Sequence, residues 1–346
     1  MIRLSRLLAA MAVIAAAAIF LGACASRQDY VLPANLRLNI EGRPLVEGPE
    51  ATVLLLETRS QMPVVKLEIA GPWGHAVWAP ALVDTGAMMY MDLPHFLARR
   101  ARPWVWLGSV GRVRTWSFGE ERTSLGVLEG VSIGDTRLSH MPVNLSPKRS
   151  ERPGAILGIS ALSLFDSVGF DWERGTMTLR RRPPGPVETL DDPRSEPGCV
   201  PFRWWHPMGG ETNRGRGYVV VDGAVGAHKV DLWIDTGCGG DLVLPRSLAQ
   251  GEPWASALEE NGSIKLFSAT GTTTAGRFKL RGQLTIGGES FTDLLVAVFD
   301  DSTLPPGATA LPILGTPLLR KFARVTIDFT NERVIFERSD TPERPE

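Results

Sequence analysis

The sequence contains few of the residues that mark a metal site or a disulfide framework. Its 346 residues include three cysteines and five histidines, and no two histidines have the i, i+4 spacing of a helical metal site. An excess of one charge is also absent, because 37 basic and 38 acidic residues leave a net charge of −1. No overall field would therefore draw the chain to nucleic acid. We expect no metal, no cofactor and no nucleic-acid partner.

Two other catalytic signatures are incomplete. The run Gly-Ile-Ser-Ala-Leu at 158–162 lacks the second glycine of a nucleophile elbow. The run GRGYVV at 215–220 begins a strand pattern and does not open a helix, so a dinucleotide-binding loop is not expected.

Long apolar runs are scarce, and the one at the start is short. It extends from Leu7 to Leu21 after the basic opening MIRLSR, whereas a membrane span needs about 20 apolar residues. A basic start, an apolar middle and small residues at a cut site are typical of a secretory signal peptide. We assign residues 1–23 to this peptide.

The predicted cut site reads LGAC at 21–24, which resembles the lipobox of bacterial lipoproteins. That resemblance implies lipid on Cys24, attachment to a membrane of the cell envelope and, because Ala25 and not Asp follows, an outer-membrane location facing the periplasm. The alternative is an ordinary signal peptide. An oxidising periplasm would permit Cys199 and Cys238 to pair, but we expect two free thiols.

The rest of the chain divides into a tether at 24–50, two halves and a tail at 339–346. The halves, 51–182 and 201–338, flank a segment rich in proline and acidic residues at 183–200, which predicts a linker.

The two halves repeat each other. ALVDTGAMMYMDLP is answered by DLWIDTGCGGDLVLP, which places Asp84 and Asp235 151 residues apart. AILG is answered by PILG, which places Gly158 and Gly315 157 residues apart. Short runs with glycine turns predict hairpins within GVSIGDTRL and QLTIGGESF. HFLARR, LSLF and SLAQ predict brief helices, so the fold is expected to be mostly β with two similar lobes.

In each half, an apolar run ends in Asp-Thr-Gly and Ile-Leu-Gly follows after a long interval. The interval from the aspartate to the glycine of Ile-Leu-Gly is 74 residues in the first half and 80 in the second. This pair of patterns resembles the aspartic proteases, the group of pepsin and the retroviral enzymes. The resemblance covers most of residues 60–338 and implies two β-barrel-like lobes with a cleft between them.

The resemblance makes Asp84 and Asp235 the catalytic residues of an endopeptidase that acts on a peptide or protein substrate. Two carboxyls about 3 Å apart cannot both ionise, so they share one proton. The ionised member activates a water, and the protonated member stabilises the oxyanion that forms. The two titrations belong to the pair, so neither residue is assigned as the base.

Neighbouring residues would support the two carboxyls. The loop glycines allow a tight turn and direct N–H groups at each carboxylate. By resemblance, the threonines lock the two loops together, and the Ile-Leu-Gly glycines lie where a Cβ would not fit. These supporting residues are Thr85, Gly86, Thr236, Gly237, Gly158 and Gly315.

One departure from pepsin concerns the residue after each triplet. Pepsin-like enzymes usually have Ser or Thr there, whereas this chain has Ala87 and Cys238. Losing a donor to the ionised carboxylate raises its pKa. We therefore expect an activity optimum less acidic than that of pepsin.

A flap that closes over the substrate could come from either half. The first candidate is 109–121 with Trp116 or Phe118, and the second is 265–276 with Thr270 and Gly271 at its tip. Ordinary strand packing explains the aromatic residues equally well, and the choice between the halves stays open.

Two alternatives to a monomeric protease were considered. The first is a peptide- or protein-binding envelope lipoprotein that keeps the fold without catalysis; a pure binder has no need of two acids. The second is dimerisation of each lobe with its twin in another chain, which the internal duplication makes unnecessary. A monomer is therefore expected.

Overall fold

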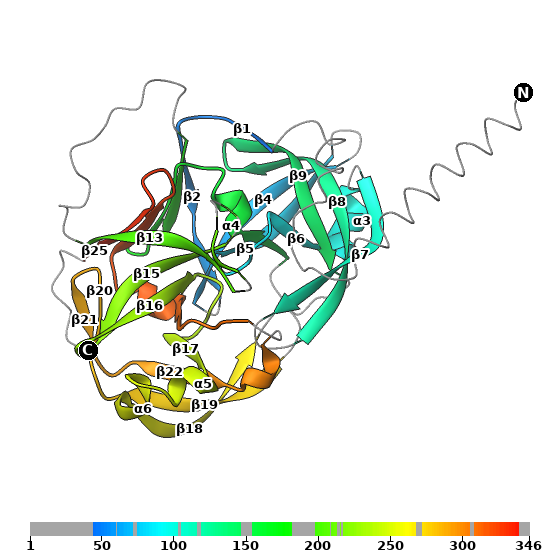
Figure 1. Cartoon of the computed structure of the whole chain (residues 1–346). Helices are drawn as coiled ribbons and strands as arrows, with labels where there is room; N and C mark the ends of the chain where they lie inside the picture. Colours follow the sequence, from blue (N-terminus) through cyan, green and yellow to red (C-terminus); the bar gives the residue numbers. More distant parts are fainter. Residues whose placement is uncertain are drawn as a thin grey trace, which may run out of the picture. The chain divides into compact units, whose positions relative to one another are not determined.

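The computed structural model describes a large part of the chain after residue 43 (Figure 1). The described ranges are 44–59, 61–71, 75–102, 105–115, 119–146, 154–181, 198–207, 209–212, 215, 217–267, 272–304 and 308–338.

The first half forms a closed six-stranded β-barrel. The ring closes because β8 pairs both with β9 and with β4. In order around the ring, the strands are β4 (Met62–Ala70), β5 (Ala76–Asp84), β10 (Ala155–Gly158), β6 (Met91–Pro94), β9 (Thr136–Ser146) and β8 (Gly119–Ile133).

The second half repeats this strand order. One difference concerns the strand that closes the ring. In the first half β8 pairs with β4, whereas in the second half a separate short strand, β20 (Leu284–Ile286), pairs with the equivalent strand β15 (Tyr218–Val225). The fold is therefore mostly β with two similar lobes, as the sequence predicted. The equivalent strands are β15 (Tyr218–Val225), β16 (His228–Asp235), β23 (Ile313–Gly315), β17 (Leu242–Pro245), β22 (Leu295–Phe299) and β19 (Thr272–Leu280).

Strands from both halves join in one further sheet, which no local pattern predicted. At its centre β11 and β24 run antiparallel with Gly169 opposite Thr326. These residues are separated by the same 157 positions as Gly158 and Gly315, so the two copies of the repeat pair around a local two-fold axis. The sheet order is β2 (Ala51–Leu55), β12 (Thr176–Arg180), β11 (Ser167–Asp171), β24 (Arg324–Asp328), β25 (Arg333–Glu337) and β13 (Cys199–His206).

Two long hairpins and several short strands complete the sheets. The hairpins are formed by β7 (Val105–Thr115) with β8 and by β18 (Leu258–Phe267) with β19. The short strands are β1 (Leu45–Glu47), β3 (Glu57–Arg59), β14 (Gly210–Glu211) and β21 (Glu289–Phe291).

Both expected glycine hairpins are present. In the first, Gly134 lies in the turn between β8 and β9 with φ of 58°. In the second, Gly287 and Gly288 connect β20 to β21 with φ of 60° and 79°. Positive φ favours glycine, which is why these runs carried a readable turn signal.

The helices of the described residues are short. Two of the three expected helices lie where they were predicted. In place of the third, expected at 162–165, a helix begins at Ile159, directly after the strand that ends at Gly158, and ends at Leu162. The helices are α3 (His95–Ala101), α4 (Ile159–Leu162), α5 (Arg246–Ala249), α6 (Trp254–Ala257), α7 (Thr316–Leu319) and the 3-10 turn η3 (Asp301–Thr303).

The strands that lead to the two aspartates are buried on both faces near their ends. In β5 the alternation of buried and exposed residues gives way to three consecutive buried residues, Ala81 to Val83. In β16 exposed and half-buried residues are followed by three consecutive buried residues, Leu232 to Ile234. A strand with a parallel neighbour and cover on both faces has such a continuous apolar pattern, and it holds the residue at its end in a fixed position.

Candidate active site

Asp84 and Asp235 are the last residues of equivalent strands, β5 and β16. Each strand pairs in parallel with the Ile-Leu-Gly strand of its own half, so that Asp84 lies opposite Gly158 and Asp235 opposite Gly315. The fold thereby brings the two motifs of each half together.

A reciprocal set of hydrogen bonds joins the two aspartate loops through Thr85 and Thr236. The Thr85 hydroxyl donates to the carbonyl of Ile234 at 2.9 Å and accepts from the backbone N–H of Thr236 at 3.0 Å. The Thr236 hydroxyl donates to the carbonyl of Val83 at 2.7 Å and accepts from the backbone N–H of Thr85 at 3.0 Å. Both threonines are buried, so these bonds hold the two lobes in one register.

Each carboxyl is held by the N–H of its own loop glycine. Gly86 donates to Oδ1 of Asp84 and Gly237 donates to Oδ1 of Asp235, both at 2.8 Å. Both glycines lie in the tight turns that we expected, in which the N–H of Ala87 donates to the carbonyl of Asp84 and that of Cys238 to the carbonyl of Asp235. Neither glycine has a positive φ, so the turn alone does not require glycine.

The reason for glycine is space for the opposite carboxyl. A Cβ on Gly86 would lie 2.3 Å from the carboxyl carbon of Asp235, and a Cβ on Gly237 would lie 2.3 Å from that of Asp84. Each aspartate therefore rests against the glycine of the other loop. Any side chain at either position would push the two carboxyls apart.

The Ile-Leu-Gly glycines are equally enclosed. A Cβ on Gly158 would lie 2.3 Å from the carbonyl oxygen of Met89, and one on Gly315 would lie 2.1 Å from that of Gly240. These neighbours are backbone atoms, which cannot rotate away as a side chain can.

Asp84 and Asp235 are hydrogen-bonded to each other through their side chains. Both residues are half-buried. Burial raises the pKa of Asp84. Burial and the charge of Asp84 raise the pKa of Asp235 well above its ordinary value. The pair therefore keeps one proton at a pH where separate aspartates would have lost theirs.

The residues after the triplets supply no hydroxyl to the carboxyls. Ala87 has none, and the Sγ atom of Cys238 lies 3.9 Å from the carbonyl oxygen of Gly240. Burial and the nearby charge of Asp235 raise the pKa of the Cys238 thiol, so the thiol stays protonated. Cys199 and Cys238 are both free, as expected.

The flap candidates Trp116, Phe118, Thr270 and Gly271 lie outside the described residues, as does Cys24. The stems of both hairpins are present. On the second stem, Ile264 and Leu266 pack against an apolar cluster that includes Trp233, the residue two positions before Asp235. The choice between the two flap candidates stays open.

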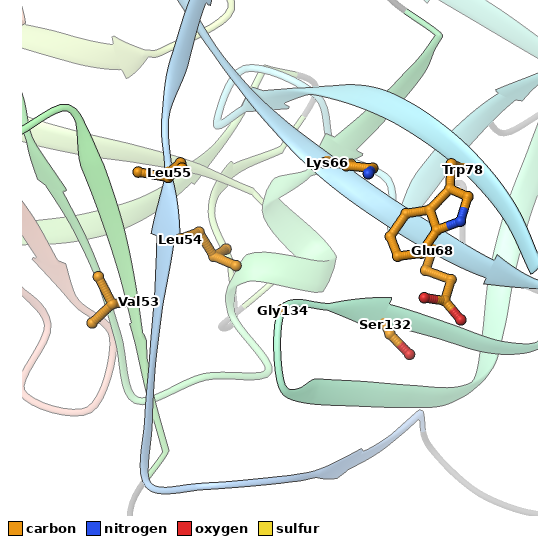
Figure 2. Close-up of a pocket in the computed structure, with 8 residues that line it drawn as sticks. All are labelled: Val53, Leu54, Leu55, Lys66, Glu68, Trp78, Ser132 and Gly134. Carbon is orange, nitrogen blue, oxygen red and sulfur yellow. The ribbon is translucent and has the colours of Figure 1, made fainter.

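A surface hollow of about 270 Å³ lies away from the aspartates. Figure 2 shows it between β2 and the strands β4 and β5, where Leu54 faces the hollow and the Lys66 ammonium lies over the ring of Trp78. None of the residues of the aspartate loops lines it.

Within the described ranges, no group of three or more histidine, cysteine or acidic residues is placed to hold a metal ion. Over the same ranges, no helix has the length and apolar character needed to cross a membrane.

One residue of the site was missed in the sequence. The hydroxyl of Thr316 donates to the carbonyl oxygen of Thr236 at 2.7 Å, and Thr316 is fully buried. The repeat itself contained the signal, because ILGT in the second half aligns with ILGI in the first. A hydroxyl in place of an apolar side chain at an aligned buried position calls for a hydrogen-bond partner.

Comparison with known proteins gives structural but no sequence matches. No protein-family profile and no curated protein matches the chain. Among solved structures, an aspartic proteinase from Irpex lacteus is 12% identical, with a TM-score of 0.49, over 84% of this chain and 98% of its own.

Two further solved structures are similar to this chain. A retropepsin-like aspartic protease from Rickettsia conorii is 17% identical over 40% of this chain and 96% of its own, with a TM-score of 0.28. The protein edgp is 11% identical over 84% of this chain and 95% of its own, with a TM-score of 0.42.

Proposed function

We propose that the chain is an aspartic endopeptidase with Asp84 and Asp235 as its catalytic pair. One observation carries the proposal: two half-buried carboxyls, one from each copy of a repeat, are hydrogen-bonded to each other and held by their own loops. A half-buried acid pair with raised pKa values destabilises a fold at neutral pH, and it suits a reaction that needs an acid and a base together.

The reaction follows from the shared proton. The ionised carboxyl takes a proton from a water, whose oxygen attacks the peptide carbonyl. The protonated carboxyl donates to the carbonyl oxygen and stabilises the negative charge that develops there. Collapse of the tetrahedral intermediate transfers a proton to the leaving nitrogen and breaks the C–N bond. The substrate is an extended peptide, with apolar residues flanking the cut as the resemblance implies.

The two carboxyls provide the direct test. Asp84→Asn and Asp235→Asn should each lower cleavage of a peptide library to background, measured by mass spectrometry on the full chain in detergent. Asp231→Asn is the matched control, because Asp231 lies on the same strand as Asp235 and pairs at the surface with Arg203. Its rate should equal that of the wild type. Cleavage at the wild-type rate by both dyad variants would refute the proposal.

A statine-type inhibitor separates the protease from the two alternatives. One inhibitor bound per monomer, lost in Asp235→Asn, supports catalysis by a single chain. Binding of peptides by the wild type without any cleavage would instead support a binding protein. One inhibitor bound per two chains would support a dimeric site.

We further propose that the enzyme is anchored through lipid on Cys24 at the outer membrane, facing the periplasm. The support is the LGAC run at the end of the apolar segment. Mass spectrometry of the N-terminal peptide should show an acylated Cys24. Cys24→Ser should release the chain from the membrane fraction, and retention of that variant would contradict the anchor.

A further inference from the structure

The two aspartate loops are nearly symmetric, but one hydrogen bond breaks the symmetry. In the second half, the Thr316 hydroxyl donates to the carbonyl of Thr236 at 2.7 Å. In the first half the equivalent residue is Ile159, which is equally buried. Among the described residues, no side chain donates to the carbonyl of Thr85. The backbone contacts match, since the N–H of Ile159 bonds to the carbonyl of Ala87 and that of Thr316 to the carbonyl of Cys238, both at 2.9 Å.

The carbonyl that accepts this bond belongs to the peptide unit that holds the Asp235 carboxyl. The planar peptide unit between Thr236 and Gly237 has its C=O on one side and its N–H on the other. Thr316 donates to the C=O, and the N–H donates to Oδ1 of Asp235 at 2.8 Å. Successive hydrogen bonds through one amide polarise each other, which strengthens each by about 10–30%. The hydroxyl thus acts on the carboxylate without touching it.

We propose that Thr316 is a positioning residue that strengthens the Gly237 N–H as a donor to Asp235 and so favours the singly ionised form of the aspartate pair. A hydrogen bond to the ionised form favours that form, and the first half provides no matching donor. The duplicated site is thereby made unequal by one hydroxyl. This inference rests on the proposed catalytic pair for its role, but the hydrogen-bond geometry does not depend on cleavage.

Other groups that face Asp235 set the background against which Thr316 acts. Asp84 is the charged neighbour on the opposite loop, and its charge opposes ionisation of Asp235. Cys238, on the same loop, has a protonated thiol, and Asp241 lies close enough to this thiol to help raise its pKa. None of these groups is changed by substituting Thr316.

The test is a carboxyl titration of the full chain with 13C-labelled aspartate. Asp84 and Asp235 are identified by the signals lost in their asparagine variants. In Thr316→Val the first ionisation of the pair should move to higher pH by about 0.3–0.6 unit, which is the size expected from partial loss of one charged hydrogen bond. The acid limb of kcat/KM should move by the same amount. An unchanged titration in Thr316→Val would overturn the inference.

Two further variants separate the hydroxyl from packing. Thr316→Ser keeps the hydroxyl and should titrate as the wild type does; a shift in Thr316→Ser equal to that in Thr316→Val would show that the hydroxyl is not the cause and would overturn the inference. Ile159→Val trims the equivalent buried position of the first half and should leave the titration unchanged. A shift in Ile159→Val equal to that in Thr316→Val would show general loosening and would also overturn the inference.

The titration also distinguishes the two proposals. If the wild type cleaves no peptide but Thr316→Val still shifts the pair, the protease proposal fails while the inference about Thr316 stands. If the wild type cleaves peptides and Thr316→Val shifts neither the titration nor the acid limb, the inference alone fails.

Discussion

At the scale of single residues, the aspartate pair opposes the stability of the fold at neutral pH. The pKa of each carboxyl is raised above its ordinary value of 3.8, with burial as the main cause. The folded protein therefore holds these protons more tightly than the unfolded chain does. This tighter binding of protons stabilises the folded state fully below about pH 3.8, and the stabilisation is lost as the pH rises through the folded-state pKa values.

Asp235→Asn should therefore raise the melting temperature at pH 7, because it removes a carboxyl that resists ionisation beside Asp84 and puts a neutral amide in its place. We expect a gain of roughly 2–4 °C, as about 1 kcal/mol gives in a domain of 150–250 residues, and no gain at pH 3.5. Scanning calorimetry at both pH values measures this, with the exposed Asp222→Asn as control. A lower melting temperature at pH 7 would contradict the sign derived from burial.

Residue identities in the site were readable from the sequence because the repeat placed them in pairs. Asp84 and Asp235, with the threonine and glycine after each, stood out as a pattern that occurs twice. The reason for Gly86 and Gly237 was not readable, since the atoms they make room for come from the opposite half of the chain. Thr316 was missed because its partner carbonyl is 80 residues away.

At the scale of elements, the local signals predicted hairpins and strand ends well. Turns such as Gly134 and Gly287 have positive φ, which favours glycine and leaves a mark in the sequence. The pairing of β11 with β24 left no such mark, because it depends on two distant segments of similar sequence meeting around an axis. Strand existence is a local property, whereas strand partnership is not.

The packing of β10 against the first aspartate loop leads to a prediction about Gly158. Gly158→Ala would place a methyl 2.3 Å from the carbonyl oxygen of Met89, so the strand or the loop must move. Overpacking of this kind costs about 1–3 kcal/mol or more, and the displaced loop should also lose activity. Chemical denaturation and peptide cleavage measure the two effects.

Gly209→Ala is the matched control for Gly158→Ala. No atom lies within 4 Å of a Cβ built on Gly209, so alanine should be tolerated there with little change in stability or rate. If Gly158→Ala were as stable and active as Gly209→Ala, β10 could not be the rigid support of the Asp84 loop.

At the scale of the whole molecule, one chain supplies both halves of the site. The central sheet pairs β11 of the first half with β24 of the second, and the threonine hydrogen bonds join the loops at the aspartates. A single chain thus contains the complete pair of acids. The threonine network adds four hydrogen bonds between buried groups to the pairing of the central sheet.

The threonine network should behave as one unit. Thr85→Val and Thr236→Val each remove two of the four hydrogen bonds while keeping the side-chain shape, so each should destabilise the fold by about 1–3 kcal/mol. Once one substitution has loosened the register between the loops, the second should cost less than it does alone, with a coupling of about 0.5–3 kcal/mol in a double-mutant cycle.

Thr85→Val combined with Thr136→Val is the control, since Thr136 bonds to Thr52 and shares no hydrogen-bond partner with Thr85. That pair should add within about 0.5 kcal/mol. Strict additivity of the Thr85 and Thr236 variants in urea unfolding would mean that the loops are held independently, and the aspartates would then depend on the sheets alone for their alignment.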